Sequence, residues 1–288
     1  MSFRTYAQLG GTDASGLGEQ VARQHARVHE RLRDVSRVVA VISGKGGVGK
    51  SWVSAGLALA LANRSYGVGV LDADLQSPTV ARLLEARGPL AVNAGGVQPA
   101  TGRSGIRVMS MDLLLDEGAP LRWTSTVGEA HTWRGIAETG ALREFLGDVV
   151  WGALDVLLVD MPPDTHRLDD LVALVPALAG AVAITLPSDE SRRSVARALR
   201  AAITAGVPLL GLIENMSGYV CDRCGETRPL FTGDAGGALA AEFDIPLIAQ
   251  LPFLPGKSAP REDILSPAAD VVLASAARST HPPLPELP

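Results

Sequence analysis

Two short stretches of this 288-residue sequence carry side chains whose types and spacing could do chemistry. The first is GKGGVGKS at residues 44–51, which fits the pattern G-x-x-x-x-G-K-[ST]. The second is GYVCDRCGET at residues 218–227, which contains Cys221 and Cys224, the only cysteines in the chain. A C-x-x-C pair is typical of a redox couple or of half a metal site, because zinc and iron–sulfur sites usually take four protein ligands.

The glycine-rich stretch predicts a phosphate-binding loop, because it lies between an apolar strand-like segment and an apolar helix-like segment. Glycines allow backbone N–H groups to turn towards phosphate oxygens, and the N-terminus of the following helix adds positive potential. Lys50 would bridge the β- and γ-phosphates, and the Ser51 hydroxyl would bind Mg²⁺. The residues expected to bind the nucleotide here are Gly44, Lys45, Gly46, Gly47, Val48, Gly49, Lys50, Ser51 and Trp52.

Carboxylates follow two other apolar strands of the predicted fold. LDADLQSPT places Asp72 and Asp74 just past one strand, and VLLVDMPPDT places Asp160 at the end of another. Because parallel strands end at the same edge of a sheet, we expect these residues close to the phosphates. Asp160 and Asp72 are predicted Mg²⁺ ligands, Asp160 acting through water, and Asp74 is predicted to orient or deprotonate the attacking water. Helix capping is the ordinary alternative for an aspartate at a strand end.

The elements that must position these residues alternate between strand and helix. Strands are predicted at 37–43, 67–74, 106–112, 155–160, 181–186, 208–215 and 245–251, helices at about 52–63, 137–146, 189–205, 235–243 and 267–277, and a hairpin or excursion at 88–110. Hydrophobic residues make up 47% of the chain but aromatic residues only 4%, so the interior is aliphatic. The alternation predicts an α/β fold, a doubly wound and mostly parallel sheet with helices on both faces.

Composition narrows the class of protein further. A net charge of −5 gives no support for a nucleic-acid binder. The first residues lack the apolar core of a signal peptide, and the longest uncharged apolar run, 171–187, is interrupted by Pro176 and Gly180. We therefore expect a cytoplasmic protein without a membrane span.

A second lysine, Lys45, stands early in the phosphate-binding loop. The resulting KGGVGK resembles the deviant Walker A signature of the MinD/ParA/NifH-like ATPases, in which this lysine crosses a dimer interface to the partner's nucleotide. The resemblance implies a homodimer that sandwiches nucleotides between its subunits. The spacing alone indicates only phosphate binding.

Longer stretches resemble the Mrp/Nbp/ApbC family of iron–sulfur carrier ATPases over about residues 30–265. They are DADLQSPT, WRGIAETGALREFLGDVVWGALDVLLVDMPP, LLGLIENMSGYVCDRCGE and LFTGDAGGALAAEFDIPLIAQLPFLP. The resemblance implies binding and hydrolysis of ATP with Mg²⁺, coupled to holding a 4Fe–4S cluster and transferring it to apo-proteins. It also implies that Asn215 contacts the adenine base.

The sequence departs from that family around one switch loop. The family usually has P-P-G-T-G-D where this chain has PPDTHR at residues 162–167, so Asp164 adds negative charge and Arg167 positive charge. Trp52 replaces a small hydroxyl residue, and residues 124–131 look inserted. Because glycines in a switch loop permit positive φ and close approach to a phosphate, these changes predict slow or differently coupled hydrolysis.

Redox chemistry, zinc binding and inert thiols are the alternatives to a cluster at Cys221 and Cys224. A two-fold axis beside this loop would bring two thiolates from each subunit together, which completes a set of four cysteines. The rival to a cluster carrier is a MinD/ParA-like positioning or partition ATPase whose dimer is bridged by structural zinc.

We expect three parts in the chain. Residues 1–35 would hold a disordered start and an amphipathic helix, from Glu19 to Asp34. Residues 36–280 would form the ATPase domain, with the C-x-x-C loop at 217–231. Residues 281–288 form a proline-rich tail.

Overall fold

The computed structural model describes residues 17–114, 130–163, 166–254 and 263–277 of the chain. Its main sheet has the strand order β10-β9-β8-β1-β7-β2-β6-β5, with β11 pairing alongside β9. The strands are β1 (Val35–Ser43), β2 (Val68–Asp72), β5 (Ala100–Thr101), β6 (Arg107–Met109), β7 (Leu154–Asp160), β8 (Gly180–Thr185), β9 (Leu209–Val220), β10 (Thr227–Arg228) and β11 (Leu247–Phe253). A separate hairpin pairs β3 (Val92–Asn93) with β4 (Gly96–Val97).

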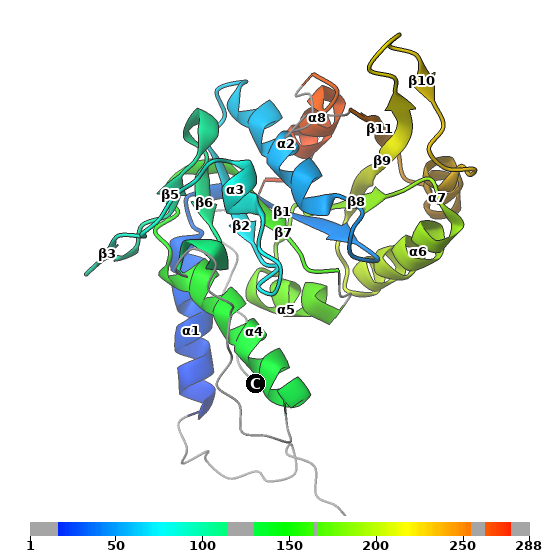
Figure 1. Cartoon of the computed structure of the whole chain (residues 1–288). Coiled ribbons are helices and arrows are strands. Elements are labelled where there is room, and N and C mark those ends of the chain that lie inside the picture. The colour runs from blue at the N-terminus through cyan, green and yellow to red at the C-terminus, as the bar shows by residue number, and fades with distance from the viewer. Residues whose placement is uncertain (1–16, 115–129, 164–165, 255–262, 278–288) are drawn as a thin grey trace, which may run out of the picture.

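Most neighbouring strands of the main sheet are parallel, as the alternation of strands and helices predicts. Only the pairs β5–β6 and β9–β10 run antiparallel among the described strands of this sheet. The helices are α1 (Leu17–Arg31), α2 (Lys50–Ala62), α3 (Val80–Leu83), α4 (Ala130–Asp148), α5 (His166–Leu174), α6 (Asp189–Thr204), α7 (Ala235–Phe243) and α8 (Ser266–Ala274). The predicted α/β, doubly wound fold class is confirmed (Figure 1).

The sheet buries a separate hydrophobic core on each face, because successive side chains of a strand point to opposite sides. In β1, Val38, Ala40 and Ile42 face the core under α1, α4, α5, α6 and α7. Val39 and Val41 face the other core, under α2, α3 and α8. The central strands are therefore almost uniformly apolar and end at one edge in polar residues, which is where the site lies.

Helix α1 packs on the domain through its apolar residues. Val28 and Leu32 are buried against the core that α4 also covers. Arg31 donates to the carbonyls of Gly95 and Gly147, and Arg27 pairs with Asp148 at 3.0 Å. These bonds join α1 to α4 and to the β3–β4 hairpin, a hairpin that the sequence predicted between residues 88 and 110.

Two elements are longer than the sequence predicted. Helix α4 begins at Ala130 rather than near Ala137. Strand β9 continues past Asn215 to Val220, because β10 and β11 both pair with its far end. The cysteine segment is therefore the tip of a β-hairpin and not a long loop that starts at residue 217.

Several sequence expectations lie outside the described residues. They concern the disordered start (1–16), most of the inserted-looking segment (124–129 of 124–131), Asp164 with Thr165, and the proline-rich tail (281–288). No helix in the described part of the chain is long and apolar enough to cross a membrane.

Candidate nucleotide and cysteine sites

The phosphate-binding loop connects the end of β1 to the first turn of α2. Gly47 and Gly49 have φ of +79° and +80°, a conformation that side chains with a Cβ rarely adopt. Gly44 packs directly on α6, where a Cβ would lie 2.0 Å from the carbonyl carbon of Ser194. A Cβ on Gly46 or Gly47 would meet nothing within 4 Å, so the inner side of the loop stays open to a ligand.

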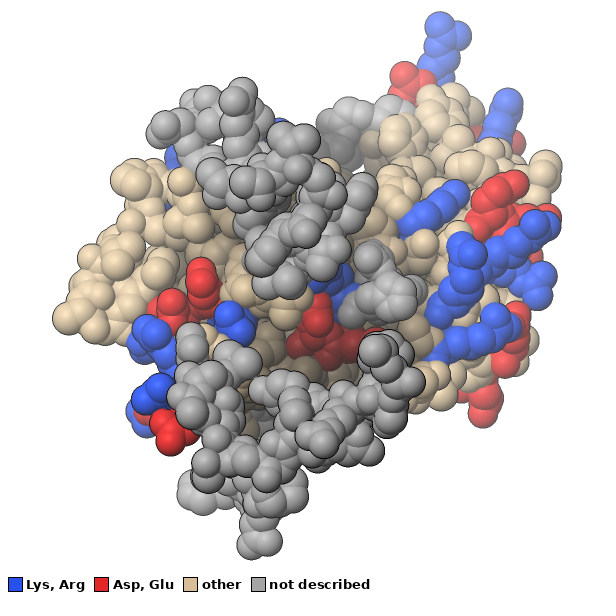
Figure 2. Space-filling view, turned by 90° about the horizontal axis from the view of Figure 1, so that it is seen from below, with Lys and Arg blue, Asp and Glu red and all other residues tan. Residues whose placement is uncertain are grey.

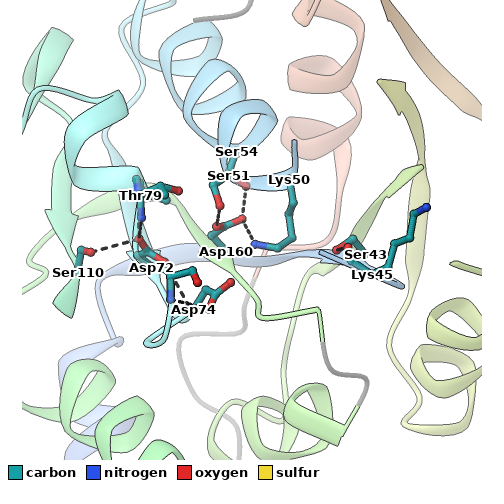
Figure 3. Close-up of polar contacts among 12 residues, drawn as sticks. Ser43, Lys45, Lys50, Ser51, Ser54, Asp72, Asp74, Thr79, Ser110 and Asp160 are labelled. Carbon is teal, nitrogen blue, oxygen red and sulfur yellow. Dashed lines mark hydrogen bonds and ion pairs between the residues drawn. The ribbon is translucent and has the colours of Figure 1, made fainter. Parts of the chain in front are cut away.

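Lys50 and Ser51 meet the strand-end carboxylate of Asp160, as Figure 3 shows. The Ser51 hydroxyl donates to Asp160 Oδ2 at 2.6 Å, and Lys50 Nζ lies 2.8 Å from Asp160 Oδ1. The Lys50 ammonium is buried and makes no well-directed hydrogen bond to any described residue. A buried ammonium whose N–H donors are unsatisfied can bind a phosphate oxygen. The adjacent hydroxyl and carboxylate oxygens are ligands of the kind that Mg²⁺ prefers.

A fourth member of this cluster, Ser54, was missed by sequence reasoning. Its hydroxyl is fully buried and donates to Asp160 Oδ1 at 2.7 Å. Ser54 follows Ser51 by three residues, so both hydroxyls lie on the same side of α2. That spacing next to a phosphate-binding loop is the signal that could have identified it.

Asp72 is fully buried, and its carboxylate accepts hydrogen bonds from the start of α3 and from the residue that follows β6. Oδ2 accepts from the backbone N–H groups of Thr79 and Val80, at 3.0 and 3.1 Å, and from the Ser110 hydroxyl at 3.2 Å. Burial first, and then the nearby negative charge of Asp160, raise the pKa of Asp72 from 3.8 to about 7. Asp72 thus shows the helix-capping geometry that was the alternative to Mg²⁺ binding, and its role as a metal ligand stays a prediction.

Asp74 lies in the loop after β2, beside the phosphate-binding loop. It lines a cavity of about 360 Å³ together with Gly46, Gly47, Pro162 and Pro163. Figure 2 shows the hollow on this face, where acidic and basic side chains lie next to one another. The predicted water-orienting carboxylate therefore shares one cavity with the phosphate-binding loop, as the strand order requires.

Lys45 points in a different direction from Lys50. In Figure 3 its side chain extends away from Asp160 and from the buried cluster. Its carbonyl accepts from the Ser43 hydroxyl at 3.1 Å, which holds the backbone of the loop in place. Action of Lys45 across a dimer interface stays a prediction.

Asn215 contacts the phosphate-binding loop, and Trp52 follows the loop in the first turn of α2. The Asn215 amide is buried and donates to the Val48 carbonyl at 2.9 Å, and Gly49 is the residue it packs against. Trp52 is half-buried and packs against the core on the α2 side of the sheet. Contact of either side chain with a nucleotide base stays a prediction.

The cysteines lie at the tip of the β9–β10 hairpin, beyond Asn215 on the same strand. The Cys221 N–H donates to the Glu226 carbonyl at 2.9 Å, and Gly225 donates to the Cys221 carbonyl with a φ of +73°. Cys221 is half-buried and Cys224 exposed, and neither is in a disulfide. The N–H of Cys224, that of Arg223 and the Cys224 thiol all hydrogen-bond the Cys221 sulfur, and so lower the pKa of Cys221 below 9.0.

The turn therefore presents a thiol that ionises readily beside a second, exposed thiol. Thiolates are the form that binds zinc and iron. Within the described part of the chain, no group of three or more His, Cys, Asp and Glu side chains is placed to hold a metal ion.

Comparison with known proteins identifies the family of the chain. The family model described as ParA, NUBPL iron-transfer P-loop NTPase, matches residues 34–264. The chain is 37% identical over 245 residues to the iron-sulfur cluster carrier protein of Saccharolobus solfataricus, covering 84% of this chain and 80% of the relative. It is 39% identical over 241 residues to the cytosolic Fe-S cluster assembly factor NUBP2 of Bos taurus, covering 81% and 84%.

Solved structures show the same fold. A nucleotide-binding protein from Archaeoglobus fulgidus, solved in complex with ADP, superposes with a TM-score of 0.66 at 32% identity and covers 86% of this chain and 92% of its own. The septum site-determining protein MinD of Pyrococcus horikoshii gives a TM-score of 0.52 at 18% identity over 83% and 94%, which shows the fold alone. With a family match that spans most of the described sheet and both candidate sites, the chain belongs to the ParA family of NUBPL-type iron-transfer P-loop NTPases.

Proposed function

We propose that this protein is a cytoplasmic ATPase that holds a 4Fe–4S cluster across a homodimer interface and transfers it to apo-proteins. The observation that carries the proposal is the pairing of a complete phosphate-binding loop with a single C-x-x-C turn. The chain has only two cysteines, whereas a cluster of this type takes four thiolates. A second copy of the chain supplies the missing pair.

The nucleotide half of the proposal assigns each residue a role. Lys50 and the loop glycines bind the phosphates, Ser51 and Asp160 hold Mg²⁺ with help from Asp72, and Asp74 orients the attacking water. Mg²⁺ supplies charge neutralisation on the phosphates. Support comes from the buried ammonium of Lys50, the open inner side of the loop and the cavity shared with Asp74.

One strand joins the two sites, which supports coupling between ATP and the cluster. Strand β9 carries Asn215 against the phosphate-binding loop and leads, six residues later, into Cys221. Between them Met216 has a φ of +54°, an uncommon conformation for a residue with a side chain. A change at the loop can therefore reach the hairpin through the backbone of a single strand.

The cluster half is tested by anaerobic reconstitution with iron and sulfide. We expect a coloured dimer with about two irons per chain, because four irons are shared by two subunits. Cys221→Ala should lose both the colour and the iron. Glu226→Ala, a substitution in the same hairpin that removes no sulfur, should keep both the colour and the iron. A colourless dimer that contains zinc would instead support the positioning or partition ATPase with a structural metal bridge.

The trans role proposed for Lys45 is tested by mixing two inactive variants. In Lys45→Ala mixed with Lys50→Ala, a lysine that acts across the interface leaves one complete site in each mixed dimer. A 1:1 mixture should then recover about a quarter of the wild-type rate, because about half of the dimers are mixed and each has one intact site of two. No recovery would show that Lys45 acts on its own nucleotide.

We further propose that hydrolysis is slow. Support comes from Arg167 in the altered switch segment, since its charge is paired with Glu138 and Asp170 and so is not available to a phosphate. Single-turnover hydrolysis as fast as in the Saccharolobus relative would contradict this.

A further inference from the structure

A polar network outside the phosphate-binding loop connects the segments on both sides of the cavity. Glu138, on α4, accepts from Gln76 Nε2 at 2.7 Å through Oε1 and pairs with Arg167 through Oε2. Gln76 lies two residues after Asp74, and Arg167 lies in the first turn of α5. One carboxylate therefore links the loop after β2 to the segment after β7.

The network is anchored on its α5 side. Arg167 Nη1 donates to Thr139 Oγ1 at 2.9 Å and to Asp170 Oδ2 at 3.0 Å. The Thr139 hydroxyl in turn donates to the same Asp170 oxygen, at 2.9 Å. The side chains of Arg167 and Glu138 are 16% and 13% exposed, so the pair is largely shielded from water and holds a defined geometry.

The loop that carries Asp74 is held at its start by the Asp74 N–H, which donates to Asp72 Oδ1 at 3.2 Å. Its turn is closed by the Ser77 N–H, which donates to the carbonyl and to the side chain of Asp74. Leu75 is buried in the core, whereas the Gln76 side chain reaches across to Glu138. Among the described residues, the Gln76 bond is thus the polar contact that ties this turn to α4, and Gln76 lines the cavity that Gly46 and Gly47 also line.

We infer that Glu138 is a positioning residue for ATP hydrolysis. Through Gln76 it holds the turn that carries Asp74, and through Arg167 it fixes the position of that turn relative to the start of α5. The inference rests on the proposed ATPase function. It also accounts for one departure of this chain, since Arg167 stands where the resembling family has an aspartate. Its charge is balanced by Glu138 and Asp170 and adds no free cation to the switch segment.

The test uses position 76, because its side chain is exposed and substitutions there leave the core intact. Gln76→Ala should lower kcat about tenfold, which corresponds to about 1.4 kcal/mol, and leave KM for ATP nearly unchanged. Gln76→Glu should lower kcat further, because it places two carboxylates together. Gln76→Lys should retain more activity than alanine, since an ammonium can pair with Glu138.

If Gln76 only stabilised the fold, kcat would not rise in the order glutamate, alanine, lysine at position 76. Gln98→Ala is the matched control, the same residue type in the β4–β5 region and away from the cavity, and it should match wild type. In the double variant Gln76→Ala/Glu138→Gln, kcat should fall little below the lower single variant, because both changes break the same link.

Equal kcat for wild type and Gln76→Ala would overturn the inference. It would also be overturned if the factors by which the two single substitutions lower kcat multiply in the double variant, or if the glutamate and lysine variants at position 76 have equal rates. A wild-type chain that hydrolyses no ATP would instead contradict the proposed function. A coloured, dimeric but inactive chain would separate the ATPase from the cluster proposal.

Discussion

Replacing Ser54 with alanine tests whether the buried cluster around Asp160 is held as the structure shows. The Ser54 hydroxyl is fully buried and donates to a carboxylate that has no exposed surface. A hydrogen bond to a charged group contributes about 1.5–3 kcal/mol to stability, more than a bond between neutral groups. Alanine removes this donor and leaves Asp160 with Ser51 and Lys50.

We expect Ser54→Ala to lower the free energy of unfolding by about 2 kcal/mol, which is a fall in Tm of about 4–8 °C. Urea unfolding of the nucleotide-free protein, followed by circular dichroism, measures the difference. Ser275→Ala is the control, because its hydroxyl donates to the neutral Val272 carbonyl at 2.7 Å. That variant should lose only about 0.5–1 kcal/mol.

A double-mutant cycle identifies the partner. In the background of Asp160→Asn the acceptor is neutral, so the same Ser54→Ala change should cost clearly less than in wild type. The reasoning is refuted if Ser54→Ala costs no more than the Ser275 control, or if its cost is the same in both backgrounds.

Three further predictions follow from contacts in the structure and from the directions of pKa shifts. In metal-free protein, the rate of alkylation of Cys221, followed for its own peptide, should have a pH midpoint below 9.0. Cys224→Ala should raise that midpoint, because it removes one hydrogen bond to the Cys221 sulfur. A midpoint of 9.0 or above in wild type would contradict the turn geometry. Because the pKa of Asp72 is raised from 3.8 to about 7, the stability that this residue contributes is full below pH 3.8 and is lost as pH rises through about 7. In urea titrations without Mg²⁺, wild type should therefore lose stability relative to Asp72→Asn between these two pH values. Parallel curves of stability against pH would refute the shift. Asn215→Ala should cost about 1–3 kcal/mol in urea unfolding, because it leaves the buried Val48 carbonyl without its donor, and an unchanged midpoint would show that this bond contributes nothing.

The parts of the site that sequence could predict are those built from local backbone geometry. The phosphate-binding loop is such a part, since Gly47 and Gly49 adopt positive φ within a few residues of a strand end and a helix start. Asp160 was also predictable, because a carboxylate at the end of an apolar strand must lie at the edge where the other parallel strands end.

The partners of those residues depended on contacts that join distant parts of the chain. Ser54 lies 106 residues from Asp160, and Gln76 lies 62 residues from Glu138. Asp72 illustrates the same limit, since only the packing of α3 and β6 shows that its oxygens already accept from Thr79, Val80 and Ser110.

The sequence alone therefore determined the fold class, the nucleotide loop and the fact that two cysteines cannot complete a cluster within one chain. The tertiary structure decided which groups surround each charge, that Lys45 extends away from Asp160, and that the cysteines follow a strand whose middle lies against the phosphate-binding loop. The physical reason is that backbone conformation and hydrophobic periodicity are local properties of the chain. Burial, pKa shifts and side-chain networks arise only when distant segments pack together.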